Sequence, residues 1–409
     1  MRRLLITFLI TGILSIGQIA SAGEIVINYD GSDPAPKKGF EMVIKAFEKA
    51  HPGITVKWNL FDHEGYKTSI RNFLTAKAPD IAAWYAGNRM APFVKAGLFE
   101  DVTDVWESAG YNKSLAATAA SMTIDGKKWG VPYTYYQWGI YYRKDIFEKL
   151  GIAVPTTWKQ FLAACATLKK EGVTPITIGT KFLWTGAGVF DYLNLRVNGY
   201  EVHNDLTAGK IKYTDSRIQS VFDRWDELVK PGYFIKNHAT FSWQEALAPM
   251  VQGKAAMYVM GNFAVAPLKK AGLTDDTLGF FQFPEITAGL AKSEEAPTDT
   301  FHIPAKAKNK ADARKFLAFL AQPKIQTQWN IILGQLPVNN QASVADDKFL
   351  KAGFKVLNNA HGIAQFYDRD APAQMAKAGM EGFQEYMIYP ERRQKILQRL
   401  DKVQKKVYK

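Results

Sequence analysis

The first hundred residues after the N-terminal segment alternate between short β-branched runs and longer segments with the apolar period of an amphipathic helix. Segments with strand character lie at 24–29, 54–58 and 79–84, and helical segments lie between them at 37–50 and 66–74. Strands that are separated by helices of this length normally pair in parallel. The alternation therefore predicts βαβ units and an α/β fold.

The same pattern returns later in the chain. Thr157 and Gln160, three residues further on, form a candidate capping box for a helix that Gly172 ends. A strand is expected at 175–179. Further helices are expected at 216–229, 311–320, 324–329 and from Pro390 to the C-terminus. We find no fixed-period repeat and no low-complexity tract.

The chain has one cysteine, Cys165, and therefore no internal disulfide, so hydrophobic cores must hold the fold together. Its 409 residues are too many for a single core. We therefore expect two lobes. Cys165 falls on the apolar face of the helix that Thr157 opens, which is typical of a buried and unreactive thiol.

The N-terminus has the features of a secretory signal peptide. Arg2 and Arg3 precede an apolar run at 4–16, and the sequence Ala-Ser-Ala at 20–22 is a suitable cleavage site. The apolar run is shorter than the roughly 20 residues that cross a bilayer. We expect residues 1–22 to be removed. Because no cysteine stands at the cleavage point, a periplasmic protein without a lipid anchor is expected.

The formal charge is +13, from 52 basic and 39 acidic residues. The lysines are scattered, and the one dense run of them, at 402–409, closes the expected terminal helix, where cations suit the helix dipole. This distribution indicates a solvated basic surface rather than a nucleic-acid-binding face. No nucleic-acid partner is expected.

Motifs for catalysis and for cofactors are missing from the sequence. There is no Walker A loop, complete G-x-G-x-x-G, G-x-S-x-G, EF-hand loop or C-x-x-C pair. His63-Glu64 begins like a zinc-protease motif, but Lys67 stands where the second histidine is needed. Neither a metal, a cofactor nor a catalytic residue is expected. A carboxylate pair from distant segments stays open, which keeps a periplasmic glycoside hydrolase or lyase as the alternative function.

Aromatic residues gather in segments that we expect to be loops at strand ends. They are Trp84-Tyr85, the run 133–138, Phe182 with Trp184, and Phe263 after Gly261-Asn262. In open α/β sheets, ligands bind beyond the carboxyl ends of the strands. Flat aromatic faces suit the C–H face of a pyranose, and polar side chains suit its hydroxyl groups. The set therefore predicts a binding site for a sugar-like ligand, with burial in a core as the alternative for each residue.

Several segments resemble a known family over nearly the whole mature chain. They are 40–53 (FEMVIKAFEKAHPG), 78–84 with Gly97-Leu98, 128–132 with 141–145, 253–263, and 311–338. Together they are similar to the large extracellular solute-binding proteins for sugars, typified by maltose-binding protein. This resemblance implies an α/β, two-lobed periplasmic binding protein fold of type II. Each lobe is then a mostly parallel sheet flanked by helices, and the ligand cleft lies between the lobes.

The resemblance also implies roles for particular residues. Trp84 matches a tryptophan that stacks on the ligand, and Asn88 with Arg89 match a polar pair that hydrogen-bonds sugar hydroxyls. Tyr136 stands where maltose-binding protein has a glutamate, and Phe263 stands where it has a stacking tryptophan. These two differences argue against a maltodextrin ligand.

The family's C-terminal ligand-facing aromatic aligns only loosely with the segment 366–369, which here offers Asp368 and Arg369. Arg369 either pairs with an anionic group of the ligand or forms a surface ion pair with Asp368 or Asp370. The complete set of candidate ligand-binding residues is Asp30, Trp84, Asn88, Arg89, Tyr136, Trp138, Trp184, Asn262, Phe263, Asp299, Asp368 and Arg369.

The resemblance implies three crossings between the lobes, near Val131-Pro132, near 300–304 and near Leu336-Pro337. The N-terminal lobe is then 23–131 with 303–336, and the C-terminal lobe is 132–302 with 337–409. The expected protein is a monomeric substrate-binding protein of a carbohydrate ABC importer. It closes around a monosaccharide, disaccharide or sugar derivative, neutral or anionic, and delivers it to the permease in the inner membrane.

Overall fold

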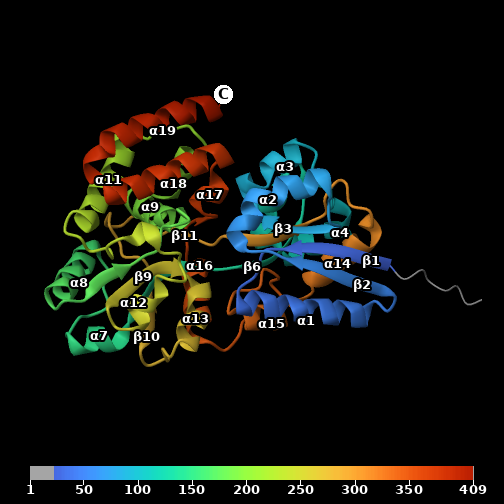
Figure 1. Cartoon of the computed structure of the whole chain (residues 1–409), viewed down its shortest axis with the longest axis horizontal. Helices are drawn as coiled ribbons and strands as arrows, with labels where there is room; N and C mark the ends of the chain where they lie inside the picture. Colours follow the sequence, from blue (N-terminus) through green and yellow to red (C-terminus); the bar gives the residue numbers. More distant parts are fainter. Residues whose placement is uncertain (1–22, 409) are drawn as a thin grey trace, which may run out of the picture.

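A computed structural model describes residues 23–408 of the chain, which form two lobes side by side (Figure 1). The expected signal peptide, 1–22, lies outside the described residues. Each lobe has its own β-sheet, its own large hydrophobic core and its own covering helices. The expectation of a two-lobed α/β fold is therefore confirmed.

The first lobe is built on a five-stranded sheet in the order β2-β1-β3-β12-β6. Its strands are β1 (Gly23–Tyr29), β2 (Ile54–Leu60), β3 (Ile81–Tyr85), β6 (Val131–Tyr135) and β12 (Thr298–His302). The pairs β1–β2 and β1–β3 are parallel, as the alternating pattern predicted, whereas β12 runs antiparallel to both β3 and β6.

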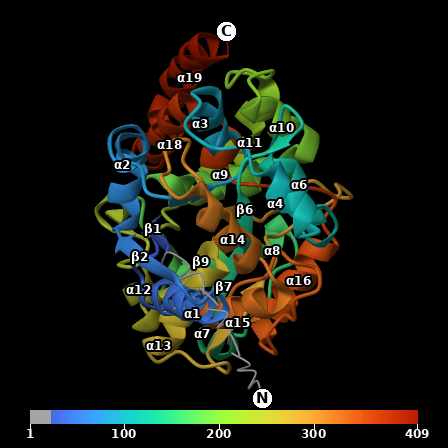
Figure 2. The ribbon, with the colours of Figure 1, turned by 90° about the vertical axis from the view of Figure 1, so that its right-hand side faces the viewer.

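Helices from both ends of the lobe's sequence cover this sheet, and Figure 2 views the molecule from their side. They include α1 (Pro34–Ala50), α2 (His63–Ala76), α4 (Thr103–Ser108), α14 (Lys310–Leu320) and α15 (Pro323–Leu333). Helices α1 and α15 pack closely. A Cβ added at Gly39 of α1 would lie 2.7 Å from the ring of Trp329 of α15, so only glycine permits this approach.

The second lobe has a four-stranded sheet in the order β10-β7-β9-β8. Its strands are β7 (Trp138–Arg143), β8 (Thr174–Thr177), β9 (Ala255–Gly261) and β10 (Leu278–Phe281), and only β8–β9 is parallel. Both sheets are thus mixed rather than mostly parallel. The reason is that chain segments entering or leaving a lobe, such as β12 and β7, join its sheet against the direction of their neighbours.

Most expected elements are present. Thr157 and Gln160 form the capping box of α8 (Trp158–Lys170), and α11 (Ser216–Val229) has the predicted bounds. Burial of Cys165 in α8 raises the pKa of its thiol, in keeping with an unreactive core residue.

The aromatic run 133–138 differs from the expectation, because its first three residues end β6 and its last begins β7. Pro132 fits in β6 because this is an edge strand, where a missing N–H is tolerated. The residues between the two strands, 136–137, connect the two sheets.

The hydrogen bonding of β6 and β12 places both strands in the first sheet. The first two crossings between the lobes therefore lie at 136–137 and 296–297. The third follows Ser343, whose N–H still bonds to Thr327 of α15 at 2.9 Å. We propose lobe boundaries that follow the sheets: 23–135 with 298–343 for the first lobe, and 138–295 with 348–408 for the second.

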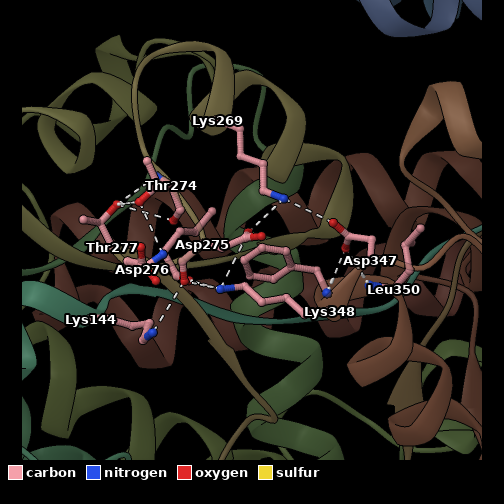
Figure 3. Close-up of polar contacts among 11 residues, drawn as sticks. Lys144, Lys269, Thr274, Asp275, Asp276, Thr277, Asp347, Lys348 and Leu350 are labelled. Carbon is pink, nitrogen blue, oxygen red and sulfur yellow. Dashed lines mark hydrogen bonds and ion pairs between the residues drawn. The ribbon is translucent and has the colours of Figure 1, made fainter.

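The helix after the third crossing, α16 (Lys348–Asn358), is held to the second lobe at its N-terminus (Figure 3). The Asp347 carboxylate caps it by accepting hydrogen bonds from the N–H groups of Phe349, at 2.8 Å, and Leu350, at 3.1 Å. Lys269 bridges Asp347, at 3.2 Å, and Asp275, at 2.9 Å. The ammonium groups of Lys269 and Lys348 lie about 5 Å from the centre of the Phe349 ring.

A second buried network supports the short helix α17 (Tyr367–Asp370). The Tyr367 N–H donates to Asp191 of α9 (Trp184–Val197) at 2.7 Å, and Asp191 lies beside Glu295 of β11 (Glu294–Glu295). Both carboxyl groups are fully buried. Burial raises the pKa of Asp191 to about 7, and burial together with the charge of Asp191 raises the pKa of Glu295 well above its usual range. The pair therefore keeps a proton at neutral pH.

We expect the substitution Asp347→Ala to lower the free energy of unfolding by about 1 to 2 kcal/mol, because it removes a helix cap that also pairs with Lys269. Asp346→Ala is the matched control, since the side chain of Asp346 is 91% exposed and pairs only with Lys351. The Asp346→Ala substitution should lower the free energy of unfolding by less than about 0.5 kcal/mol. Chemical denaturation of the two variants measures both values, and equal losses would contradict the cap's role.

The Asp191–Glu295 pair predicts a pH dependence of stability. The folded chain holds a proton that an unfolded Asp191, with its usual pKa near 3.8, has released. The free energy of unfolding should therefore fall as the pH rises from about 4 to about 7. In Glu295→Gln this slope should be shallower, whereas in the control Glu391→Gln, whose side chain is 69% exposed, it should match that of the unchanged protein. Thermal melts across this pH range give the slopes.

Candidate functional site

A cavity of about 870 Å³ lies between the two lobes and is lined by residues of both. Most of the residues singled out from the sequence line it, although their loops and strands are far apart in the chain. Those that line it are Asp30, Trp84, Tyr136, Trp138, Trp184, Phe263, Asp299, Asp368 and Arg369. Asn88, Arg89 and Asn262 are not part of the lining.

Aromatic side chains make up much of the second-lobe wall of the cavity. Trp184 begins α9, Trp138 begins β7, and Phe263 lies in the short 3-10 helix Asn262–Ala264 that follows β9. The ring of Trp184 lies 5.9 Å from that of Trp138 and 6.3 Å from that of Phe263. Both Trp184 and Phe263 keep part of their surface exposed, so their faces remain available to a ligand.

Sequence analysis missed Trp243 and Phe366 as cavity residues. Trp243 packs edge-on against Phe263 at 5.1 Å, and Phe366 lies 4.9 Å from Trp138. Trp243 lies in a segment without a clear helical or strand period, so no local signal pointed to it.

Polar groups of the first-lobe wall lie at the carboxyl ends of β1 and β3, beside the aromatic residues Trp84 and Tyr85. Asp30 follows β1, and its Oδ2 lies 3.2 Å from Nδ1 of His63 and accepts a hydrogen bond of 3.3 Å from the Tyr85 hydroxyl. Burial opposes ionisation of Asp30, but the hydrogen bond and charge of His63 outweigh it and lower the pKa of this carboxyl. Asp30 is therefore ionised at neutral pH.

Arg369 of α17 reaches across to the first lobe. Its guanidinium donates to the carbonyl of Thr298 at 3.1 Å and to the Tyr136 hydroxyl at 3.0 Å, and it pairs with Asp299 at 3.0 Å. It also lies 4.2 Å from the centre of the Tyr85 ring. Arg369 is therefore buried and pairs with Asp299, and it does not form the surface ion pair with Asp368 or Asp370. Burial raises the pKa of Asp299 although Arg369 opposes this.

Asp368, next to Arg369, is only 5% exposed and lines the cavity. Among residues 23–408 its carboxylate has no hydrogen-bond donor within 3.5 Å and no cationic group within 4.0 Å. Burial raises its pKa, but the charges of Arg89, Lys67, Arg369 and His63 together lower it below the usual range. An ionised and unpaired carboxylate therefore faces the cavity.

The three candidates outside the lining join parts of the structure to each other. Asn88 donates a hydrogen bond to the carbonyl of Asp370, and Asn262 donates one of 2.9 Å to the carbonyl of Gly334. Both bonds link one lobe to the other. The Arg89 carbonyl accepts a hydrogen bond of 3.0 Å from the indole of Trp84, which fixes the orientation of that ring.

Two strained residues deliver cavity side chains. Leu183, with φ of 72°, precedes Trp184, and Phe366, with φ of 149°, precedes the helix that carries Asp368 and Arg369. Such backbone angles are costly outside glycine and cluster at functional sites. The strain indicates that these side chains are positioned for a task other than stability.

Residues 23–408 contain no group of three or more His, Cys, Asp or Glu side chains placed to hold a metal ion. In this part of the chain, no helix combines the length and the apolar character needed to cross a membrane.

Comparison with known proteins agrees with this architecture. Residues 31–327 match the family model for bacterial extracellular solute-binding proteins. An uncharacterized ABC transporter extracellular-binding protein of Pyrococcus horikoshii is 28% identical over 386 residues, covering 88% of this chain and 86% of its own. A multiple sugar-binding protein of Streptococcus mutans is 26% identical over 312 residues, covering 75% of this chain and 73% of its own.

Among solved structures, the bacterial solute receptor AcbH, described as having an exclusive preference for β-D-galactopyranose, superposes with a TM-score of 0.88 and 29% identity. The alignment covers 95% of this chain and all of that one. The raffinose complex of RafE, at 21% identity and a TM-score of 0.77, shares the fold. Since the family model covers most of the sequence and the two-lobed architecture agrees with it, the chain belongs to the bacterial extracellular solute-binding protein family, the substrate-binding components of ABC transporters.

Proposed function

We propose that this protein is the periplasmic receptor of a carbohydrate ABC importer and binds a sugar between its lobes. The observation that carries the proposal is the combination of aromatic and polar groups in one cavity wall. Aromatic rings, including Trp184 and Phe263 of the second lobe, line the cavity together with polar groups, including Asp30 and Asp299 of the first lobe. A pyranose needs both, because its C–H face is apolar and its edge carries hydroxyl groups.

The relatives support a sugar as the ligand. The Streptococcus mutans relative is named for multiple sugars, and the AcbH receptor is described by its preference for β-D-galactopyranose. The cavity of about 870 Å³ has room for more than one sugar ring, so its size allows a monosaccharide or a disaccharide.

The lobes are expected to close on the ligand by rotation about the crossings at 136–137, 296–297 and 344–347. A sugar that contacts the aromatic wall and the polar wall at once does so fully only in the closed form. Its binding therefore shifts the population toward that form, which the permease in the inner membrane then recognises. The protein acts as a monomer in this scheme.

Membership of the solute-binding family sets aside the alternative of a glycoside hydrolase or lyase, because these components of ABC transporters are receptors and not enzymes. The carboxylates of the first-lobe wall also have structural partners, since Asp30 is bonded to His63 and Asp299 to Arg369.

The aromatic wall should carry much of the affinity. We expect Trp184→Ala to weaken sugar binding by about 10- to 100-fold, because it removes a stacking face from the cavity wall. Phe354→Ala is the matched control, since Phe354 is an exposed aromatic residue of α16 outside the cavity. This variant should bind the sugar with unchanged affinity. Titration calorimetry measures both. Equal affinities of the two variants would contradict the role of the aromatic wall.

Ligand closure should also change the shape of the molecule. Small-angle scattering of the mature chain should show a smaller radius of gyration when a sugar that raises the melting temperature is present at saturation. A sugar that leaves the melting temperature unchanged serves as the control and should leave the radius unchanged. The same radius with both sugars would contradict the closure mechanism.

A further inference from the structure

The cleft contains a carboxylate that the protein itself leaves unpaired. Asp368 is 5% exposed, lines the cavity, and has neither a hydrogen-bond donor nor an ion-pair partner among the described residues. A buried ionised group without partners is costly, so such groups normally meet a ligand or ordered water. The ligand that suits Asp368 offers hydrogen-bond donors and brings no negative charge.

Arg369, the arginine next to Asp368 in the cavity lining, is not available to a negatively charged ligand. Arg369 already contacts Thr298, Asp299 and Tyr136, all within 3.1 Å, and one face of its guanidinium lies on the Tyr85 ring. A bidentate pair with a carboxylate or phosphate of a ligand requires free N–H groups in one plane. Arg369 therefore positions Asp299 and Tyr136 rather than binding an anion.

The charge of the cleft as a whole has the same sign as Asp368. Its lining contains seven aspartates and glutamates, against four lysines and arginines and one histidine, His63, in a chain whose net charge is +13. Two of the four cations are paired, Arg369 with Asp299 and Lys67 with Glu64 at 3.3 Å. An acidic cleft in a basic protein repels an anionic ligand at short range.

From these observations we infer that the cleft selects neutral sugars and rejects their carboxylated counterparts, with Asp368 as the residue that makes the distinction. The inference rests on the proposed sugar-binding function. Two hydroxyl groups of a neutral sugar can donate to the two oxygens of Asp368. A cationic amino sugar fits less well, because Arg89, Lys67, Arg369 and His63 already surround this carboxylate with positive charge.

The test uses matched sugars that differ only in charge. Neutral D-galactose, D-glucose and lactose are compared with D-galacturonate, D-glucuronate and lactobionate, and with D-galactosamine and D-glucosamine, first by thermal shift and then by calorimetry. The neutral member of a pair should bind at least about 10-fold more tightly than its carboxylated partner. Equal or tighter binding of the carboxylated sugar, or tightest binding of the amino sugar, would overturn the inference while leaving the proposed function intact. If no sugar of the panel binds, the proposed function fails and the inference fails with it.

The variant Asp368→Asn tests the residue itself. It keeps the shape and removes the charge, so affinity for the neutral sugar should fall by about 10-fold, and the preference over the carboxylated sugar should shrink by a similar factor. Glu391→Gln removes the same charge from an exposed site outside the cleft and should change neither value. An unchanged preference in Asp368→Asn would show that this carboxylate does not discriminate. If that variant does not fold, the comparison of sugars on the unchanged protein still decides the question.

Discussion

The guanidinium of Arg369 is the contact around which the cleft is organised. It belongs to α17 in the second lobe, yet its partners Thr298 and Asp299 lie in the first sheet, and Tyr136 lies in the first crossing. One buried cation thus ties the second lobe to the first and fixes two side chains that line the cavity, Asp299 and Tyr136. A buried ion pair contributes little net stability, but loss of one partner leaves the other charge stranded. The main effect of this ion pair is therefore to fix the positions of the side chains in the cleft.

The short helix that carries Arg369 is held in place by groups whose burial or backbone angle costs free energy of folding. Tyr367 bonds to Asp191, whose pKa is raised by burial next to Glu295, and Phe366 holds a backbone angle that is rare outside glycine. Natural chains keep such features where function needs them. The strain at Leu183, just before Trp184, has the same explanation, since both sites place a cavity side chain at the start of a helix.

Most structural features that depend on residues close together in the chain could be predicted from the sequence. The capping box at Thr157, the helix at 216–229 and the buried Cys165 follow from spacing within one helix, and these were confirmed. The strand character of 131–135 was missed, because β6 gains its structure from β12, which lies more than 160 residues further along the chain. The partner of Arg369 was missed for the same reason, since Asp299 reaches it only through the folded sheet.

In the candidate site, too, contacts between distant segments could not be predicted from the sequence. Aromatic residues next to strand ends could be gathered from the sequence, because the carboxyl ends of neighbouring strands meet at one edge of a sheet. Asn88, Arg89 and Asn262 follow strand ends as well, yet they do not line the cavity, and the side chains of Asn88 and Asn262 donate to backbone carbonyls elsewhere. Position along a strand places a residue at the correct edge, but the direction of its side chain depends on which groups elsewhere remain without partners. Buried polar atoms generally need a hydrogen-bond partner. Some polar residues of a cleft therefore bond to other parts of the protein, and the others are left to bind the ligand. Asp368 belongs to the residues left for the ligand, because its carboxylate has no partner among residues 23–408.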